Sequence, residues 1–364
     1  MSFTIFFLSL FLSLFARAQV DFEDGVFPEI VPSSRALAMG NAFVARVDDE
    51  SAPFYNPAGL GSVRGWNFHL SNFLLEFSKD FSREVTTDMS NTFKYMADSF
   101  DLDGLRKVHQ NSPGHSANTR FSMMPNLTTR FLSFGLFYVR HIKTFYGGRD
   151  GDRFEFADRT DSGPYIGANF SLWGGIFKGG LSLIRLKRYE VRGDADMGSS
   201  FTPASSQRSK GTMRLYIAGA RIILPFKTLP TLSATLHNVE DEEFTAAHNG
   251  WQAPQSIVPN LAVGVSITPY VGRGKKLHIE INHKDLEKNR EMENSARWMA
   301  GMELNFSKAL FLRAGYRNNF ISGGIGVRTK TFHFDLSSYA KGKHSERFPK
   351  TEDRGLVFSS SFRL

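Results

Sequence analysis

The 364-residue chain contains no cysteine, and after its first residues it contains no long apolar run. Without cysteine there is no disulfide, which excludes the small cross-linked scaffolds common among exported proteins. Without a later run of about eighteen apolar residues, a membrane protein built of helices is excluded. Two classes remain: a soluble fold, or a barrel that exposes only alternate residues of each strand to lipid.

Motifs for catalysis and for cofactor binding are also missing. The sequence has no His-Glu-x-x-His, no Gly-x-Ser-x-Gly and no Gly-rich phosphate loop followed by Lys-Ser/Thr. A triad dispersed over several strands stays open as a minor alternative, because four histidines fall in predicted strands. We expect no catalytic residue, no cofactor and no enzyme activity.

Two acidic clusters are the candidates for a cation site. The first consists of three adjacent acids without the spaced oxygen ligands of a known calcium loop, namely Asp48, Asp49 and Glu50. The second lies in a Gly-rich stretch beside two arginines and consists of Asp150, Asp152 and Asp158. A solvated or helix-capping cluster and a charged loop explain these residues better than a metal, so we expect no metal site.

The balance of charge is basic, with a formal net charge of +8. The basic residues are spread along the chain and interleaved with acids, as in the segment 287–291. This pattern is typical of a solvated surface, whereas nucleic-acid binding needs a basic face or stripe. We therefore expect no nucleic-acid partner.

The first eighteen residues have the features of a secretory signal peptide. An apolar run from Phe3 to Phe15 is followed by Ala16-Arg17-Ala18, which places small residues where a signal peptidase reads them. The run is too short to span a membrane. We expect residues 1–18 to be removed and the exported chain to begin at Gln19.

From Trp66 onward, apolar residues recur at every second position in runs of about ten. Successive side chains of a strand point to opposite faces, so these runs predict strands with one apolar face. A soluble sandwich shows the same alternation. The predicted strands are 66–78, 118–124, 130–142, 164–173, 179–191, 211–224, 231–238, 258–268, 275–283, 296–304, 309–316, 320–327, 331–340 and 355–364.

The lengths of the connections favour the barrel. Linkers after the odd-numbered strands are mostly long and polar, and linkers after the even-numbered strands are all short. Transmembrane barrels have short turns on the periplasmic side and long loops outside. The fold class we predict is all-β, a transmembrane antiparallel barrel of about 14 strands. The last strand alternates as expected, although its aromatic Phe362 stands two positions before the end.

The segment from Ser34 to Leu60 is rich in small residues and ends in Asn56-Pro57-Ala58-Gly59. Locally, Pro57 keeps Asn56 out of the helical region and Gly59 tolerates a turn. The whole segment resembles the N-terminal signature of the FadL/OMPP1/TodX superfamily of outer-membrane transport proteins. The resemblance implies that residues 19–65 form a hatch, or plug, in the lumen and that residues 66–364 form the barrel. It also makes Asn56, Pro57, Ala58 and Gly59 structural hatch residues.

A helical excursion is predicted in the first outer loop, over residues 83–110. Apolar residues stand there at helical spacing, with an acid near the start and basic residues near the end. The stripe either packs on the barrel rim or covers a hydrophobic entry groove, as the helical outer loops of the resembled family do. On the second interpretation, the residues that capture a hydrophobic ligand are Met89, Phe93, Met96 and Phe100.

The resemblance implies passive uptake of hydrophobic compounds across the cell outer membrane, with long-chain fatty acids as the default substrate. The expected surroundings are outer-membrane lipid and lipopolysaccharide. The main alternative is the PorV-like branch of the superfamily, whose members are partners in protein secretion. A third hypothesis is a soluble periplasmic β-protein. Pro125 is a candidate position for irregular strand pairing, which would open a gap in the wall.

Overall fold

The computed structural model describes residues 30–78, 99–111, 116–147, 153–198, 203–248, 250–289, 292–306, 309–342 and 352–363. The predicted signal peptide, most of the predicted loop helix and part of the second acidic cluster lie outside these residues. The strands are β1 (Asn67–Ser78), β2 (Ser116–Met123), β3 (Asn126–Thr128), β4 (Leu132–Phe145), β5 (Phe154–Leu172), β6 (Phe177–Ala195), β7 (Arg208–Ile223), β8 (Thr231–His237), β9 (Thr245–Ala246), β10 (Asn260–Ile267), β11 (Lys276–His283), β12 (Trp298–Asn305), β13 (Leu310–Arg317), β14 (Phe320–Arg328), β15 (Phe332–Gly342) and β16 (Glu352–Arg363).

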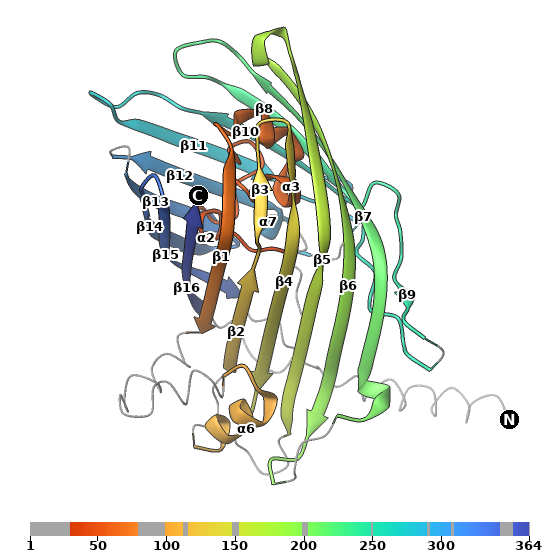
Figure 1. Ribbon diagram of the computed structural model, residues 1–364. Helices are drawn as coiled ribbons and strands as arrows, with labels where there is room; N and C mark the ends of the chain where they lie inside the picture. Colours follow the sequence, from red (N-terminus) through yellow and green to blue (C-terminus); the bar gives the residue numbers. More distant parts are fainter. Residues whose placement is uncertain are drawn as a thin grey trace, which may run out of the picture.

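These strands form one antiparallel sheet that closes on itself (Figure 1). Each strand pairs with its neighbours along the chain, and β16 pairs with β1, for example Leu75 with Phe358. Strand β3 continues the position of β2 in the wall, and β9 lies off the main path. The wall traced by the described residues therefore has fourteen strands, which confirms the predicted fold class.

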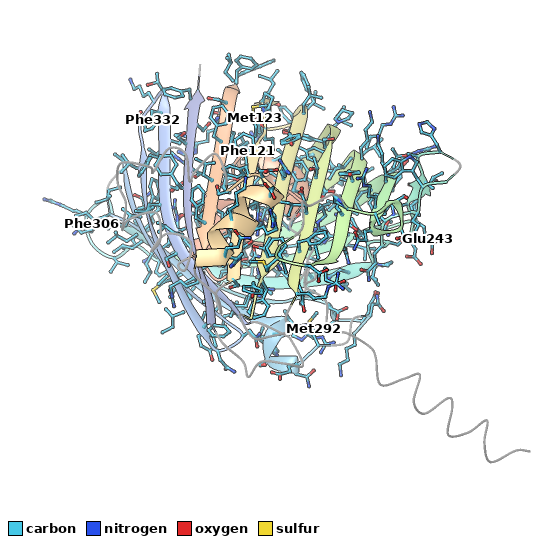
Figure 2. The ribbon with its side chains drawn as sticks, turned by 90° about the horizontal axis from the view of Figure 1, so that it is seen from below. Phe121, Met123, Glu243, Met292, Phe306 and Phe332 are labelled. Atoms are coloured by element: carbon cyan, nitrogen blue, oxygen red, sulfur yellow. The ribbon has the colours of Figure 1, made fainter. Side chains whose placement is uncertain are left out.

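Side chains alternate around the wall as a membrane barrel requires. Outward positions carry large apolar side chains that remain exposed, such as Phe134, Leu181 and Val265. Figure 2 shows side chains projecting from the wall, among them the labelled Phe306 and Phe332. Inward positions are mostly polar and buried. An exposed apolar surface of this extent is stable only in lipid, so the alternation that the sequence predicts has its physical cause in the bilayer.

Both ends of the wall follow the predicted segregation of loop lengths. The end that holds Asn67 and Arg363, here called the terminal end, also holds the short turns, as between β14 and β15. The opposite end, here called the loop end, holds the long connections. Exposed aromatic side chains gather on the turns of the terminal end, where rings suit a membrane–water interface. They include Phe131, Trp173, Phe226, Tyr270 and Phe306.

Strand β5 is about ten residues longer toward the loop end than its apolar pattern predicted, and β6 extends with it. The inward-facing charged residues of this extension form ion pairs in the lumen. Arg188 donates to the Asp161 carboxylate at 2.8 and 2.9 Å, and Arg159 lies 3.8 Å from Glu190. These ion pairs neutralise the charges on the lumen face. The strand pairing can therefore continue beyond the point where the alternation of apolar and polar residues ends.

Strands β2 and β3 are separated by an interruption at Pro125, where the pairing with β1 shifts by one residue and the pairing with β4 keeps its register. The ladder of β1 jumps from the pair Phe73–Met123 to the pair His69–Asn126. Single hydrogen bonds flank the interruption: Met124 N–H donates to the carbonyl of β1 at 3.1 Å, and β4 donates to the Pro125 carbonyl at 3.1 Å. Proline has no N–H to extend the ladder, so the irregular pairing predicted at Pro125 is confirmed.

The segment of residues 30–65 lies in the lumen. It forms the short helices α2 (Ser34–Ala38), α3 (Ala52–Tyr55) and the 3-10 helix η2 (Pro57–Ser62). Nearly all of its side chains from residue 30 to 63 are buried. Its partners are inward-facing side chains on strands from β5 round to β15, so it crosses the lumen. Among the described residues, no helix is long and apolar enough to span a membrane.

Candidate functional site

The predicted residues Asn56, Pro57, Ala58 and Gly59 form a compact turn at the start of η2. The Asn56 side chain caps η2 by accepting from the Ala58 N–H at 3.0 Å, and its amide donates to the Val44 carbonyl at 2.9 Å. Pro57 occupies the first position of η2, where its missing N–H has no cost. Asn56 is fully buried. The structure therefore brings all four predicted residues together as a structural unit.

This turn sits in a notch of the wall made by two glycines that lie opposite each other on β6 and β7. Gly180 and Gly219 are register partners. A Cβ on Gly219 would stand 2.1 Å from the Asn56 side-chain oxygen, and a Cβ on Gly180 would stand 2.4 Å from the Pro57 carbonyl carbon. Glycine inside a strand marks close approach of another backbone, so the notch fits this turn and no side chain.

Polar side chains of the wall fasten the same part of the segment by donating to its backbone carbonyls. The donors come from β5, β6 and β7, and none of the bonds is longer than 3.2 Å. They run from Asn169 to Ala58 (3.2 Å), from Lys178 to Gly61 (3.0 Å), and from Arg221 to Val47 (2.9 Å) and Val44 (3.2 Å). Because carbonyls are the acceptors, the contact depends on the path of the backbone.

Replacing Gly219 with valine should dislodge this turn. The added side chain needs space that Asn56 fills, and overpacking of this kind costs about 1–3 kcal/mol. We expect faster proteolysis of residues 30–65 in detergent and a lower unfolding temperature. The matched control is Gly323→Val on β14, whose added Cβ meets no atom closer than 3.4 Å. Equal protease sensitivity of the two variants would contradict the notch.

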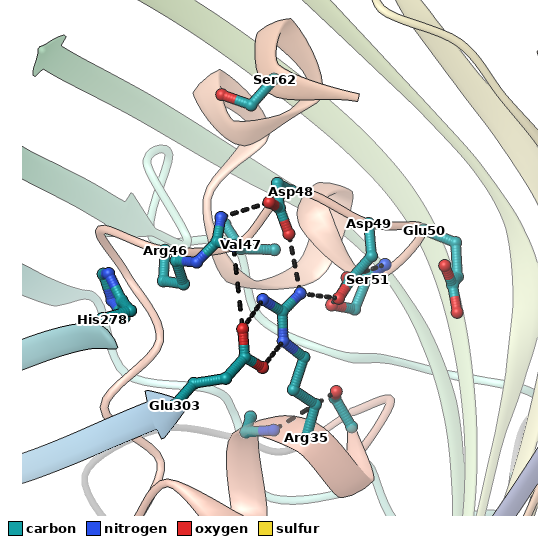
Figure 3. Close-up of polar contacts among 12 residues, drawn as sticks. Arg35, Arg46, Val47, Asp48, Asp49, Glu50, Ser51, Ser62, His278 and Glu303 are labelled. Carbon is teal, nitrogen blue, oxygen red and sulfur yellow. Dashed lines mark hydrogen bonds and ion pairs between the residues drawn. The ribbon is translucent and has the colours of Figure 1, made fainter. Parts of the chain in front are cut away.

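The second attachment of the segment is an ion network around Arg35 and Glu303 (Figure 3). Both Arg35, from α2, and Glu303, from β12, are buried. The Arg35 guanidinium makes two hydrogen bonds to Glu303, at 2.6 and 2.7 Å, and reaches Asp48 at 2.7 Å and Asp49 at 2.9 Å. Arg313 of β13 also donates to Glu303, at 2.8 Å. The network joins two parts of the segment to the wall.

The charges of this network control its own ionisation. Burial lowers the pKa of the Arg35 guanidinium, but the charges of Glu303, Asp48 and Asp49 outweigh burial and raise the pKa above its ordinary value. Burial likewise raises the pKa of the Asp48 carboxyl, but Arg46 and Arg35 outweigh it and hold that pKa below its ordinary value. A depressed carboxyl pKa stabilises the fold above the unfolded pKa, about 3.9. This stabilisation is lost as the pH falls from there through the folded pKa.

One side of the lumen is apolar. Inward side chains of β4 to β7 pack with the segment and with the connection between β8 and β10. Phe54 of α3 makes edge-to-face contacts with Phe137 and Tyr165, at centroid distances of 5.6 and 4.8 Å. The same cluster contains Phe244, from the connection at the loop end, and Met124, at the wall interruption. One continuous apolar cluster thus reaches from the connection at the loop end to Met124, and smaller apolar clusters lie on the other side of the lumen.

A chamber of about 510 Å³ opens between the segment and the wall toward the terminal end. Its lining is mainly polar, with a few apolar side chains such as Val63 and Phe311. The cationic side chains among the lining residues are Arg35, Arg46, Arg64, Arg221, Lys276, Arg328 and Arg363. A second, smaller cavity of about 40 Å³ lies beside the wall interruption and is lined in part by Leu74 and Met124.

Of the residues predicted to capture a ligand, Met89, Phe93 and Met96 lie outside the described residues. Phe100 is described, and it packs against Phe77 and Phe121 of the wall, at centroid distances of 6.0 and 6.3 Å. The helix that follows, α6 (Leu102–Asn111), joins a buried cluster with side chains of β2, β4, β5 and β6. By strand alternation, these positions face away from the lumen. The described part of this loop therefore packs on the outer rim.

The two predicted acidic clusters have other partners. Asp48 and Asp49 pair with Arg35, and Asp158 accepts from Arg140 at 2.7 and 3.2 Å. Among the residues that the structure describes, there is no group of three metal-ligating side chains. The structure thus assigns the acids it describes to ion pairs within the protein.

Gly180, Gly219 and Glu303 are site residues that the strand pattern alone did not identify. The available signal was position: each stands on the lumen face of a predicted strand, between side chains that face lipid. A glycine there indicates close approach of another backbone, and a carboxylate there needs a partner. Neither observation names the partner, because Asn56 and Arg35 are more than a hundred residues away in the sequence.

Comparison with known proteins gives the fold. No protein-family model matches the chain. No curated protein matches it in sequence. The solved structure of the toluene transporter TodX of Pseudomonas putida is similar, with a TM-score of 0.55 and 10% identity over 91% of this chain and 97% of that one. That of the toluene transporter TbuX of Ralstonia pickettii has a TM-score of 0.53 and 12% identity over 92% and 98%. The chain therefore has the FadL/TodX-type barrel fold that its N-terminal segment predicted.

Proposed function

We propose that this chain is an outer-membrane channel for the passive uptake of hydrophobic compounds. The observation that carries the proposal is the apolar path through the lumen. It begins at Phe244 on the loop end, passes Phe137 and Phe54, and ends at Met124 beside the wall interruption. A channel for hydrophilic solutes has a polar lumen, whereas an apolar lumen side stabilises apolar solutes by removing them from water.

The segment of residues 30–65 is the hatch in this proposal. It fills the lumen between the chamber and the loop end, and Phe54 occupies the middle of the apolar path. A ligand has to displace this side chain in order to pass. The notch that holds Asn56 and the ion network that holds Arg35 lie on different sides of the lumen, on β6–β7 and on β12–β13. One attachment can therefore yield while the other holds.

The interruption at Pro125 is the proposed exit. The pairing with β1 shifts by one residue there, whereas the pairing with β4 keeps its register. Separation of the strands there exposes few unpaired backbone groups, and an exit through the wall spares an apolar solute from entering water. A partner role in protein secretion, as in the PorV-like branch, requires no such weak point in the wall. The interruption therefore favours the channel.

We propose a long-chain fatty acid as the default substrate, on the resemblance of the N-terminal segment. The structural neighbours named above are toluene transporters, which supports hydrophobic solutes more generally. The experiment is uptake of radiolabelled oleate and toluene by cells whose own outer membrane excludes them. Expression of this chain should raise the initial uptake rate of at least one of them severalfold.

The variant Phe137→Asn should abolish most of that uptake, because it places an amide in the apolar path. The matched control is Phe311→Asn, which removes another buried phenylalanine of the lumen but lies in the chamber lining and outside the apolar cluster. Both variants must reach the membrane in equal amounts. No uptake above that of cells without the protein, or equal uptake by the two variants, would overturn the proposed channel.

A further inference from the structure

The outer surface of β6 and β7 changes sharply from apolar to basic toward the loop end. On β6 the outward residues from Phe177 to Leu183 carry no charge, and the next outward residue is Arg185. On β7 the outward residues from Ile222 to Tyr216 carry no charge, and the next one toward the loop end is Arg214. Phe177 and Arg185 are eight residues apart, which spans about 26 Å along a strand. With the usual tilt of about 35–45° this run covers about 18–21 Å of the apolar band of about 25 Å on membrane barrels. Both arginines therefore stand near its edge.

Arg185 and Arg214 are direct register partners on neighbouring strands. Both are exposed. The inward neighbours of each are buried apolar residues, so the two guanidinium groups share the outward face. Like charges directly opposite each other destabilise a strand pair. This destabilising pair stands at the level where a barrel meets the headgroups of the bilayer.

More cations continue the same outward stripe. Lys187 follows Arg185 on β6, and Lys210 precedes Arg214 on β7, where it lies 5.8 Å from the centre of the Trp251 ring. The described ion pairs of the protein include none of these four cations. The nearest acid is Glu242, which accepts from the backbone N–H of Arg214 at 2.7 Å and belongs to the acidic run 240–243. None of these acids forms a described ion pair with the four cations, so their charges stay available on the outer surface.

Strand β4, which is separated from β6 by β5, carries an outward arginine whose charge is paired within the protein. Arg140 is the first charged outward residue of β4, after Tyr138, and it forms two hydrogen bonds with Asp158 of β5. On β6 and β7 the described residues form no such ion pair, because the Glu242 carboxylate contacts the backbone N–H of Arg214 and not its guanidinium. The cation stripe defined by Arg185, Lys187, Lys210 and Arg214 is thus built for an anion from outside the protein.

We propose that this cation stripe binds the phosphate groups of a phosphorylated glycolipid of the outer leaflet. Arginine pairs are suited to phosphate because the planar guanidinium donates two parallel hydrogen bonds. The acyl chains of such a lipid would lie on the apolar residues directly below, such as Leu181 and Leu183. The proposal rests on the outer-membrane location proposed above, and it is independent of what the lumen transports.

The test is binding of diphosphorylated lipid A to the purified barrel in neutral detergent, measured by native mass spectrometry. Lipid A from which both phosphates have been removed is the reference ligand. We expect the intact protein to bind the phosphorylated form at least tenfold more tightly. Inorganic phosphate at the same concentration should not displace it, because the free ion lacks the acyl contacts. Equal affinity for the two lipids, or displacement by inorganic phosphate, would overturn the proposal.

The double variant Arg185→Gln/Arg214→Gln should lose this preference. The matched control is Arg273→Gln/Lys330→Gln, which removes two exposed cations from turns at the terminal end. In detergent without the lipid, the first variant should unfold at the same or a higher temperature, because a repulsion has been removed. Equal losses of lipid binding in the two variants would contradict the stripe, and a lower unfolding temperature of the first would assign the arginines a structural role. Uptake of the transported solute serves as a separate readout.

Discussion

Deleting residues 30–63 should turn the barrel into an open pore. A wall of fourteen strands encloses more space than the eight-stranded barrels whose side chains alone fill the interior. Here the segment supplies the missing volume, and its contacts run from β5 round to β15. We expect the single-channel conductance in planar bilayers to rise at least tenfold over that of the intact chain.

The deletion variant has to form a closed barrel for this result to count. Heat-modifiable migration in electrophoresis reports that directly, and the Gly323→Val variant provides a folded barrel with its segment in place. An unchanged conductance of a correctly folded deletion variant would show that the inward connection around Phe244 and the lumen ion pairs seal the pore by themselves. The hatch role of the segment would then be wrong.

Replacing Glu303 with alanine should be the most destabilising single substitution in the lumen. Glu303 is 1% exposed, and it pairs with Arg35, Arg313 and Arg46. Removing one partner from a buried ion network leaves the others uncompensated, at a cost of about 3–5 kcal/mol. We expect a lower midpoint of urea unfolding in detergent and faster proteolysis of residues 30–65.

A double-mutant cycle separates the network from a general loss of packing. In the Glu303→Ala background, the further change Arg35→Ala should cost much less than it does in the intact protein, because its main partner is already gone. The matched control is Glu287→Ala, which removes an exposed carboxylate from the connection after β11. Additive effects of Glu303 and Arg35 would contradict the network.

The wall could be predicted strand by strand because lipid imposes a local rule. Each outward residue contacts the same solvent, so the alternation around Leu132–Tyr138 or Leu356–Phe362 can be read without knowledge of its neighbours. The rule does not apply to the parts of the strands that extend beyond the bilayer. The loop-end half of β5 was missed because Asp161 and Arg188 satisfy each other across strands, and that pairing leaves no period of hydrophobicity to read.

The turn from Asn56 to Gly59 was also predictable in part. Its own residues determine its shape, since the Asn56 side chain and the ring of Pro57 act on the nearest backbone. The place where this turn packs was not predictable. The notch consists of Gly180 and Gly219, and a glycine in a strand indicates close approach of another backbone without identifying it.

The sequence by itself therefore determined the barrel, its strand number, the likeness of its N-terminal segment and the irregular pairing at Pro125. Each of these follows from short-range chemistry: alternate exposure to lipid, loop length, or a missing N–H. Only the tertiary structure decided that Arg35 meets Glu303, that Phe54 and Met124 belong to one apolar cluster, and that Arg185 faces Arg214. These contacts join residues far apart in the chain, and strand register and barrel closure, which no single segment encodes, bring them together.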